Sequence, residues 1–239
     1  MLTVFFFSAF IVAAVATVTG FGSATLLTPI AAYFMDIKRA IVLVAFFHFF
    51  SNLSRVGLFR TNISWRLVPL YGLPMIITCF LGAYMIKYLP SEWIRLFFGV
   101  FLILFVVSSF FSPKTGLKPS NLVAVLGGTF TGFISGLLGV GGAPRSAFIQ
   151  AFGLSRDGYI ATNAILALMA DLTRIPTYLS LKVVNPHGED MMLIPILVIV
   201  AYLGTLLGMR ITQNIPQETF RKVILVALFL AGLDFVLRR

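Results

Sequence analysis

Long runs of apolar residues without a polar side constrain this chain more than any other feature. Four examples are residues 41–50, 96–111, 193–207 and 223–236. A helix on the surface of a soluble protein shows a polar face, whereas a helix that is apolar all round lies in lipid or among other apolar helices. The chain is 59% hydrophobic and 11% charged, against about 25% charged residues in a soluble domain. We therefore predict an all-α integral membrane protein.

Charge and cysteine content exclude several function classes. The net charge is +10, with the basic residues at the ends of the apolar segments, which favours contact with anionic lipid headgroups over nucleic acid. A single cysteine, Cys79, excludes an internal disulfide and a cysteine metal cluster. The two histidines, His48 and His187, lack metal-ligand spacing, so we expect no metal or other cofactor. The first apolar segment has no basic residues before it, and we expect it to stay in the membrane uncleaved.

Two of the apolar segments are too long for one crossing. The chain divides into eight apolar stretches, at residues 2–34, 40–59, 67–88, 94–111, 121–152, 158–181, 191–213 and 220–237. Six of them have about the 20 residues of one membrane helix. The first would be roughly 50 Å long as a straight helix, against a hydrocarbon core of about 30 Å, and the fifth is also too long.

Glycine clusters interrupt both long stretches. The first contains Gly20-Phe21-Gly22-Ser23, and the fifth contains a glycine-rich segment at 136–144 that ends in Pro144. Glycine weakens a helix and proline removes a backbone donor. Such backbone is tolerated at membrane depth only where protein or a polar cavity surrounds it. We predict a broken or re-entrant helix in each stretch, and seven to eight transmembrane segments in total.

The two glycine breaks belong to an internal repeat. At an offset of 119, Gly20-Phe21-Gly22 aligns with Gly139-Val140-Gly141, and the segment 52–55 aligns with 171–174. Beyond the polar linker at 182–190 the offset becomes 126, where prolines, glycines, Glu92 with Glu218 and basic residues recur. Collinear recurrence of charged and helix-breaking residues indicates duplication. The prediction is one membrane domain made of two repeats, 1–119 and 120–239, each with about four apolar segments.

The relative orientation of the repeats stays open at this level. Parallel repeats follow if each broken segment crosses once, and inverted repeats follow if each turns back. The 18 Lys and Arg residues divide almost equally between the two faces in either case, so the positive-inside rule does not decide. Transporters often contain inverted repeats, which favours that arrangement.

The glycine breaks are the first candidates for a substrate site. A helix that restarts at mid-membrane presents unpaired N–H groups and partial positive charge, which together attract anions. The candidate residues are Gly20, Gly22, Ser23, Gly139, Gly141 and Gly142, with Thr25 and Ser146 as further hydroxyl donors. The alternative is that these glycines only allow close packing of helices.

Three arginines are the second group of substrate-binding candidates. Arg55 and Arg174 occupy matching positions of the repeats, and Arg145 opens a half-helix. A guanidinium offers a planar fork of donors suited to carboxylate, sulfonate or phosphate oxygens. The alternative for Arg55 and Arg174 is that their side chains extend to the lipid headgroups.

Asp171, its counterpart Asn52 and the nearby His48 are candidates for ion coupling. Asp171 lies one turn before Arg174, so an i, i+3 ion pair is the simpler explanation of this carboxylate. A coupling carboxylate that exchanges a proton is the alternative. For His48 we expect a buried, hydrogen-bonded side chain, and a proton relay is the alternative.

These motifs, in this order, resemble the TauE/SafE sulfite exporter family, also called DUF81 or TSUP. The resemblance covers almost the whole chain and rests on the segments 20–23, 139–144, 161–163, 174–178 and 216–218, together with Pro29 and Gly208. It implies a multi-pass protein of the bacterial inner membrane that moves sulfite, sulfonates, thiosulfate or related organic acids. Two departures, Ser23 where a glycine is frequent and Phe148 where the first half has Pro29, leave the substrate open.

The sequence as a whole predicts a secondary transporter or permease that exports or imports a small anion by alternating access of its halves. We expect no catalysis, although a membrane enzyme is one alternative, with Ser135-Gly136 as a possible nucleophile turn. A membrane assembly partner that transports nothing is another. No nucleotide-binding loop is present, so ATP-driven transport would need a separate subunit. The expected partners are the small anion and the lipid bilayer, and a homodimer is one assembly open to the chain.

Overall fold

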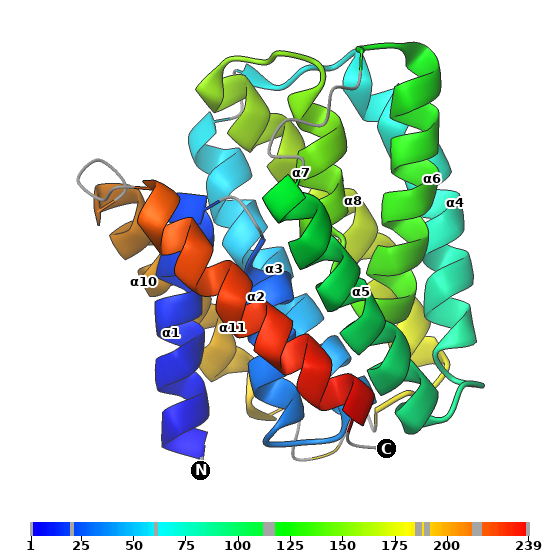
Figure 1. Ribbon diagram of the computed structural model, residues 1–239, viewed down its shortest axis with the longest axis vertical. Coiled ribbons are helices and arrows are strands. Elements are labelled where there is room, and N and C mark those ends of the chain that lie inside the picture. The colour runs from blue at the N-terminus through cyan, green and yellow to red at the C-terminus, as the bar shows by residue number, and fades with distance from the viewer. Residues whose placement is uncertain are drawn as a thin grey trace.

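The computed structural model describes residues 2–19, 22–59, 62–111, 118–184, 188, 192–211 and 217–237. Over these residues the chain forms ten α-helices and no β-strand (Figure 1). The helices are α1 (Leu2–Thr19), α2 (Ser23–Ala32), α3 (Ile37–Phe59), α4 (Leu67–Met85), α5 (Ser91–Phe111), α6 (Asn121–Leu138), α7 (Gly142–Gln150), α8 (Arg156–Ser180), α10 (Ile194–Ile211) and α11 (Gln217–Leu237).

Membrane-crossing helices account for much of this fold. Within the described residues, four helices are long and apolar enough to cross a bilayer, judged by length and composition: Ile37–Gly57, Leu67–Met85, Ser91–Phe110 and Asn121–Leu138. Four shorter apolar helices accompany them: Thr3–Ala16, Ser23–Ala32, Ile194–Gly208 and Ile224–Leu237. The helix α8 is also long, but it carries Asp171 and Arg174 in its buried face. The fold is that of a multi-pass helical membrane protein.

Each of the two long apolar stretches contains two helices. The first stretch is α1 followed by α2, with Gly22 at φ +83° immediately before α2. The other is α6 followed by α7, and Gly139 at φ +77° closes α6 with its N–H bonded to the carbonyl of Ser135 at 3.0 Å. A positive φ favours glycine, which explains why the chain changes direction at these two residues. Gly136 lies inside α6 rather than in the break.

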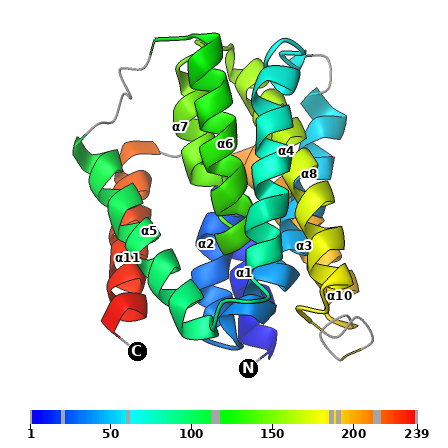
Figure 2. The same cartoon turned by 90° about the vertical axis from the view of Figure 1, so that its right-hand side faces the viewer.

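Glycines bring two pairs of helices into backbone contact. On α6, Gly128, Gly132 and Gly136 recur every four residues, and a Cβ at any of them would overlap a main-chain oxygen of α4. On α10, Gly204 and Gly208 meet main-chain oxygens of α1 in the same way. Small residues at this spacing allow membrane helices to approach closely. The pair α4–α6 therefore packs along most of its length (Figure 2), and α1 packs along α10.

The remaining helices surround the short ones. The helices α3 and α8 pack against each other, and α5 pairs with α11 at one side of the molecule (Figure 2). The short helix α2 lies in the lower part of the view in Figure 1 and the short helix α7 in the upper part. The helix α2 also contacts α7. The contact joins their starting ends, where Gly22 lies against Gly142. The fold thus places both breaks at one point inside the bundle.

Candidate functional site

The two short helices start against each other. A Cβ on Gly22 would lie 3.1 Å from the Cα of Gly142, the first residue of α7. Ser23 and Gly142 are both buried, and neither α2 nor α7 has a side chain capping its start. The first N–H groups of a helix have no partner within the helix and carry partial positive charge. Two such helix starts therefore face one small region. Gly20, which the sequence placed here, lies outside the described residues.

Hydroxyl groups border this region without making hydrogen bonds. Gly141 packs so closely on α6 that a Cβ there would overlap Oγ of Ser135. The Oγ atoms of Ser23 and Ser135 are buried and have no hydrogen-bond partner among the residues that the structure describes. A buried hydroxyl without a partner costs about 1–3 kcal/mol. These atoms are therefore available to a small polar ligand.

Arg145 extends from α7 into the same interior. Its side chain is buried, and its Nε donates to Oδ1 of Asn163 on α8 at 3.2 Å. The amide of Asn163 in turn donates to the carbonyl of Tyr159 at 3.1 Å, which fixes its orientation. Arg145 interacts electrostatically with Asp171 and Arg174. The single neutral hydrogen bond to Asn163 positions the guanidinium without neutralising it.

Asp171 is the centre of a three-residue network between α3 and α8. Its Oδ1 accepts from Arg174 Nε at 2.8 Å and lies 2.7 Å from Arg174 Nη2. Its Oδ2 lies 2.7 Å from Nδ1 of His48. All three side chains are buried, and Asp171 is fully inaccessible. The i, i+3 ion pair expected from the sequence is therefore present, and it has a third member.

Arg174 joins this network to the break between α6 and α7. Its Nη1 donates to the carbonyl of Ser135 at 3.1 Å, and a Cβ on Gly139 would lie 3.3 Å from the same nitrogen. The hydroxyl of Tyr178 on α8 donates to the carbonyl of Gly136 on α6. Arg174 is 1% exposed and points into the protein. The alternative that it extends to the lipid headgroups is wrong.

The equivalent positions of the first half form a simpler arrangement on α3. Asn52 donates to the carbonyl of His48 at 2.7 Å and accepts from Nη1 of Arg55 at 3.2 Å. Arg55 is buried, at 9% exposed, and interacts electrostatically with Arg145. Its side chain thus also points inward rather than to the headgroups. The Asn52 amide thus accepts a hydrogen bond from Arg55, as the Asp171 carboxylate accepts one from Arg174, but the amide carries no charge.

Buried charge in this interior is unbalanced. Among the side chains that the structure describes, the buried charged groups are three guanidiniums and one carboxylate: Arg55, Arg145, Arg174 and Asp171. With His48 neutral their formal charges sum to +2, three minus one. A buried charge without compensation is costly. A bound anion would supply the missing negative charge at the place where two helix starts and free hydroxyls already meet.

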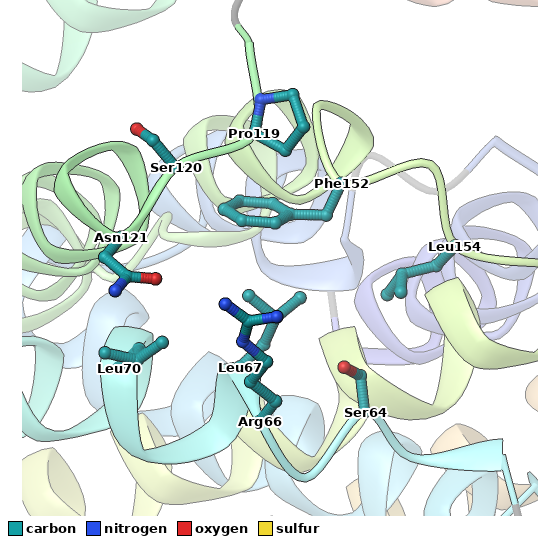
Figure 3. Close-up of a pocket in the computed structure, with 9 residues that line it drawn as sticks. All are labelled: Ser64, Arg66, Leu67, Leu70, Pro119, Ser120, Asn121, Phe152 and Leu154. Carbon is teal, nitrogen blue, oxygen red and sulfur yellow. The ribbon is translucent and has the colours of Figure 1, made fainter.

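Two clefts lie at the outer ends of the short helices. The Arg66 cleft, about 380 Å³ in volume, lies beyond the end of α7. Figure 3 shows the Arg66 guanidinium in the middle of this cleft, beneath the ring of Phe152. The Asp234 cleft, about 340 Å³, lies at the end of α2, where Tyr33 donates to Oδ2 of Asp234 at 2.9 Å. Its other lining residues include Asp36 and Arg95.

Comparison with known proteins identifies the family. The chain matches the family model described as Sulfite exporter TauE/SafE over residues 5–235. The chain belongs to the TauE/SafE family. A probable membrane transporter protein from Methanocaldococcus jannaschii is 26% identical over 251 residues, covering 95% of this chain and 92% of the relative. No solved structure matches the chain.

Membership of the TauE/SafE family confirms the resemblance drawn from the glycine motifs and makes the chain a membrane transporter. It favours transport over catalysis. Among the described residues, no three His, Cys, Asp or Glu side chains are grouped to hold a metal ion.

Sequence reasoning missed three features around the two helix starts: the role of Asn163, the position of Ser135 and the contact between Tyr71 and Thr131. Asn163, the hydrogen-bond partner of Arg145, was visible only as a member of the motif at 161–163. Ser135 was considered as a nucleophile, whereas its hydroxyl lies beside Gly141. Tyr71 and Thr131 form a buried hydrogen bond of 2.6 Å between α4 and α6, and no sequence pattern links them.

Proposed function

We propose that this TauE/SafE protein is a secondary transporter of small anions, which bind where α2 and α7 start. The observation that carries the proposal is the formal charge of +2 on the buried described side chains, beside two uncapped helix starts. Helix starts and guanidiniums are the groups that bind oxyanions in proteins. Intramembrane ionisable groups that face a cavity or partner are commonly functional.

The surroundings favour a small and highly charged substrate. Gly22 and Gly142 lie in contact, so the region between the helix starts accepts a compact ligand rather than an extended one. Ser23, Ser135 and Arg145 supply donors from three helices, which suits the several oxygens of sulfite, thiosulfate, a sulfonate or a related organic acid. The family description names sulfite, and the archaeal relative is described only as a probable membrane transporter.

An inverted relation between the two halves is part of the proposal. Gly82 of α4 meets the carbonyl of Phe133 on α6, and Gly208 of α10 meets the carbonyl of Ala14 on α1. At the sequence offsets of 126 and 119, these are the same contact made twice. Exchanging the halves thus maps α4–α6 onto α10–α1. The two short helices extend to opposite ends of the molecule (Figures 1 and 2), which favours inverted over parallel repeats.

The positions of the clefts support alternating access. The Arg66 cleft and the Asp234 cleft lie at the outer ends of α7 and α2, and the anion site lies at their inner ends. We propose that the site communicates with one cleft at a time across the plasma membrane. The two repeats, 1–119 and 120–239, would move relative to each other during this exchange.

The test is counterflow of radiolabelled sulfite, thiosulfate and sulfoacetate in proteoliposomes. Ser23→Ala removes a buried hydroxyl with no described partner, so it should leave the fold intact while raising KM about tenfold or more. Its matched control is Thr28→Ala, which removes another such hydroxyl from α2 more than one turn further on and should leave KM unchanged.

A second pair of variants tests the charge. Arg145→Gln should abolish counterflow, whereas Arg210→Gln, at an exposed position in the last turn of α10, should not affect it. The proposal fails if wild-type protein moves none of the three anions. It also fails if Ser23→Ala and Arg145→Gln both transport them as wild type does.

A further inference from the structure

His48 has one ring nitrogen in use and one without a partner. On α3, its Nδ1 lies 2.7 Å from Oδ2 of Asp171. Its Nε2 is buried and has no hydrogen-bond partner among the described residues. The buried, hydrogen-bonded side chain that the sequence led us to expect is present at Nδ1, and Nε2 is the exception. An imidazole nitrogen left without a partner inside a membrane protein is costly, so its retention needs a reason.

The neighbours of His48 determine which nitrogen carries the hydrogen. Asp171 Oδ1 is held by Arg174, through Nε and Nη2, and this contact favours the ionised carboxylate. A carboxylate only accepts hydrogen bonds, so Nδ1 of His48 carries the hydrogen and donates it to Oδ2. In the neutral ring Nε2 then has a free lone pair. This nitrogen is a base within an interior that has an excess of positive charge.

The charged and titratable groups around His48 come from several helices. From α8 these are Asp171 and Arg174, and from α7 it is Arg145, which also acts on His48 electrostatically. Cys79 of α4 lies near Asp171, and Arg55 lies two turns away on α3 itself. The helix α2 contributes no titratable side chain. The remaining groups on α5 and α10 are exposed or half-buried: Glu92, Arg95, Tyr202 and Arg210.

At the offset of 119, two of the buried arginines align with each other, whereas the His48–Asp171 pair has no aligned counterpart. Arg55 and Arg174 are equivalent in the two repeats, and both are buried. The position equivalent to His48 at the offset of 119 is Ala167, and the position equivalent to Asp171 is Asn52. Arg55 and Arg174 thus form a repeated pair, whereas the imidazole–carboxylate pair is present once.

From this geometry we propose that His48 couples anion transport to a proton. In the empty site, the excess positive charge of Arg145 and Arg174 opposes a further positive charge on the imidazole. A bound anion removes that opposition, and His48 then takes up one proton at Nε2 while Nδ1–H stays on Asp171. When the anion leaves on the other side, the N–H bond at Nε2 breaks and the proton leaves with it. The inference rests on the proposed anion transport, and by linkage the proton also raises anion affinity.

Direct observation of the ring is the first test. The chain has two histidines, so His187→Gln leaves His48 as the one reporter in histidine-selective ¹⁵N NMR of the protein in nanodiscs. Thiosulfate is a suitable probe because it stays a dianion between about pH 5 and 8, where histidine titrates. We expect the imidazolium fraction of His48 at a fixed pH to rise when thiosulfate is added. An unchanged fraction, in protein that still exchanges thiosulfate, would overturn the inference.

Flux measurements provide a second test that needs no label. In wild-type and His187→Gln proteoliposomes, thiosulfate uptake should accelerate several-fold when the outside is more acidic than the inside. His48→Gln keeps an amide that can donate to Asp171 but takes up no proton, so it should retain counterflow at equal pH with a raised KM for thiosulfate and lose this acceleration. Retained acceleration in His48→Gln would overturn the coupling role and leave the proposed transport standing. Absent thiosulfate counterflow in wild type would overturn the inference together with thiosulfate as a substrate.

Discussion

The break between α1 and α2 and the break between α6 and α7 occupy equivalent positions of the two repeats but differ in chemistry. The second break has Arg145 on its short helix and Ser135 beside Gly141. At the offset of 119 the first break has Leu26 and Ala16 in those places. It contributes instead a hydroxyl at Ser23, where the second half has Gly142.

This difference separates the backbone of the two breaks from their side chains. Each break has one glycine with positive φ, Gly22 or Gly139, and an uncapped short helix, but the two glycines are not aligned at the offset of 119. The carboxylate and two of the three buried guanidiniums lie on α7 and α8, whereas α3 contributes Arg55 and the imidazole. The two breaks thus have a similar backbone and different side chains, so substitutions at positions aligned at the offset of 119 should have unequal effects.

The largest inequality is expected between Asp171 and Asn52. Asp171→Ala leaves Arg174 buried without its carboxylate and removes the partner of His48, which should cost about 3–5 kcal/mol. Asn52→Ala removes one hydrogen bond with Arg55 and one with the carbonyl of His48 and should cost about 1–2 kcal/mol. The measurement is unfolding of each variant in mixed micelles with an increasing fraction of denaturing detergent. Equal losses would mean that the halves are energetically equivalent, contrary to the comparison.

An intermediate effect is expected at the glycines of the two breaks. Gly22→Ala and Gly139→Ala each place a side chain at positive φ, which costs about 1–3 kcal/mol. A Cβ on Gly22 meets the backbone of Gly142 in the other half, whereas a Cβ on Gly139 meets the side chain of Ile41, which can shift.

The two variants should therefore differ in counterflow more than in stability, with the greater loss in Gly22→Ala. The control is Gly57→Ala, where a Cβ meets nothing within 4 Å. A loss of counterflow in this control as large as in Gly22→Ala would remove the special role assigned to the breaks.

The smallest effect is expected at the clefts. Arg66→Gln removes the exposed cation from the cleft beyond α7, which under the proposed function would attract anions before they enter. Uptake through that cleft should slow by less than about tenfold at low ionic strength, and the difference should disappear at high salt. Initial rates at two salt concentrations test this. A loss that persists at high salt would place Arg66 in direct contact with the bound anion.

The sequence predicted the helices of this protein well because the membrane simplifies the choice. Six apolar stretches of ordinary length each contain one long helix, and each of the two overlong stretches contains two helices. Backbone groups in lipid must be satisfied within the helix, so hydrophobic length largely determines the element. The positions of Gly22 and Gly139 were also visible, since only glycine readily adopts their φ angles.

Contacts between the helices could not be obtained in this way. The distance along the chain between His48 and Asp171 carries no signal that α3 and α8 pack together. The burial of Arg55 and Arg174 was likewise open, because a long side chain near a helix end can reach either the interior or the headgroups. Pairing of helices depends on the whole set of surfaces, and a single sequence does not reveal it.

Backbone contact along α4 and α6 also limits how this protein can move. The glycines at 128, 132 and 136 bring the two backbones together, and the hydrogen bond between Tyr71 and Thr131 also joins the two helices. We therefore expect the pair, and equally α1 with α10, to move as one rigid body. Each pair joins one helix from residues 1–119 to one helix from residues 120–239. Spin-label distances within a pair should stay constant through a transport cycle, while distances from a pair to α2 or α7 change.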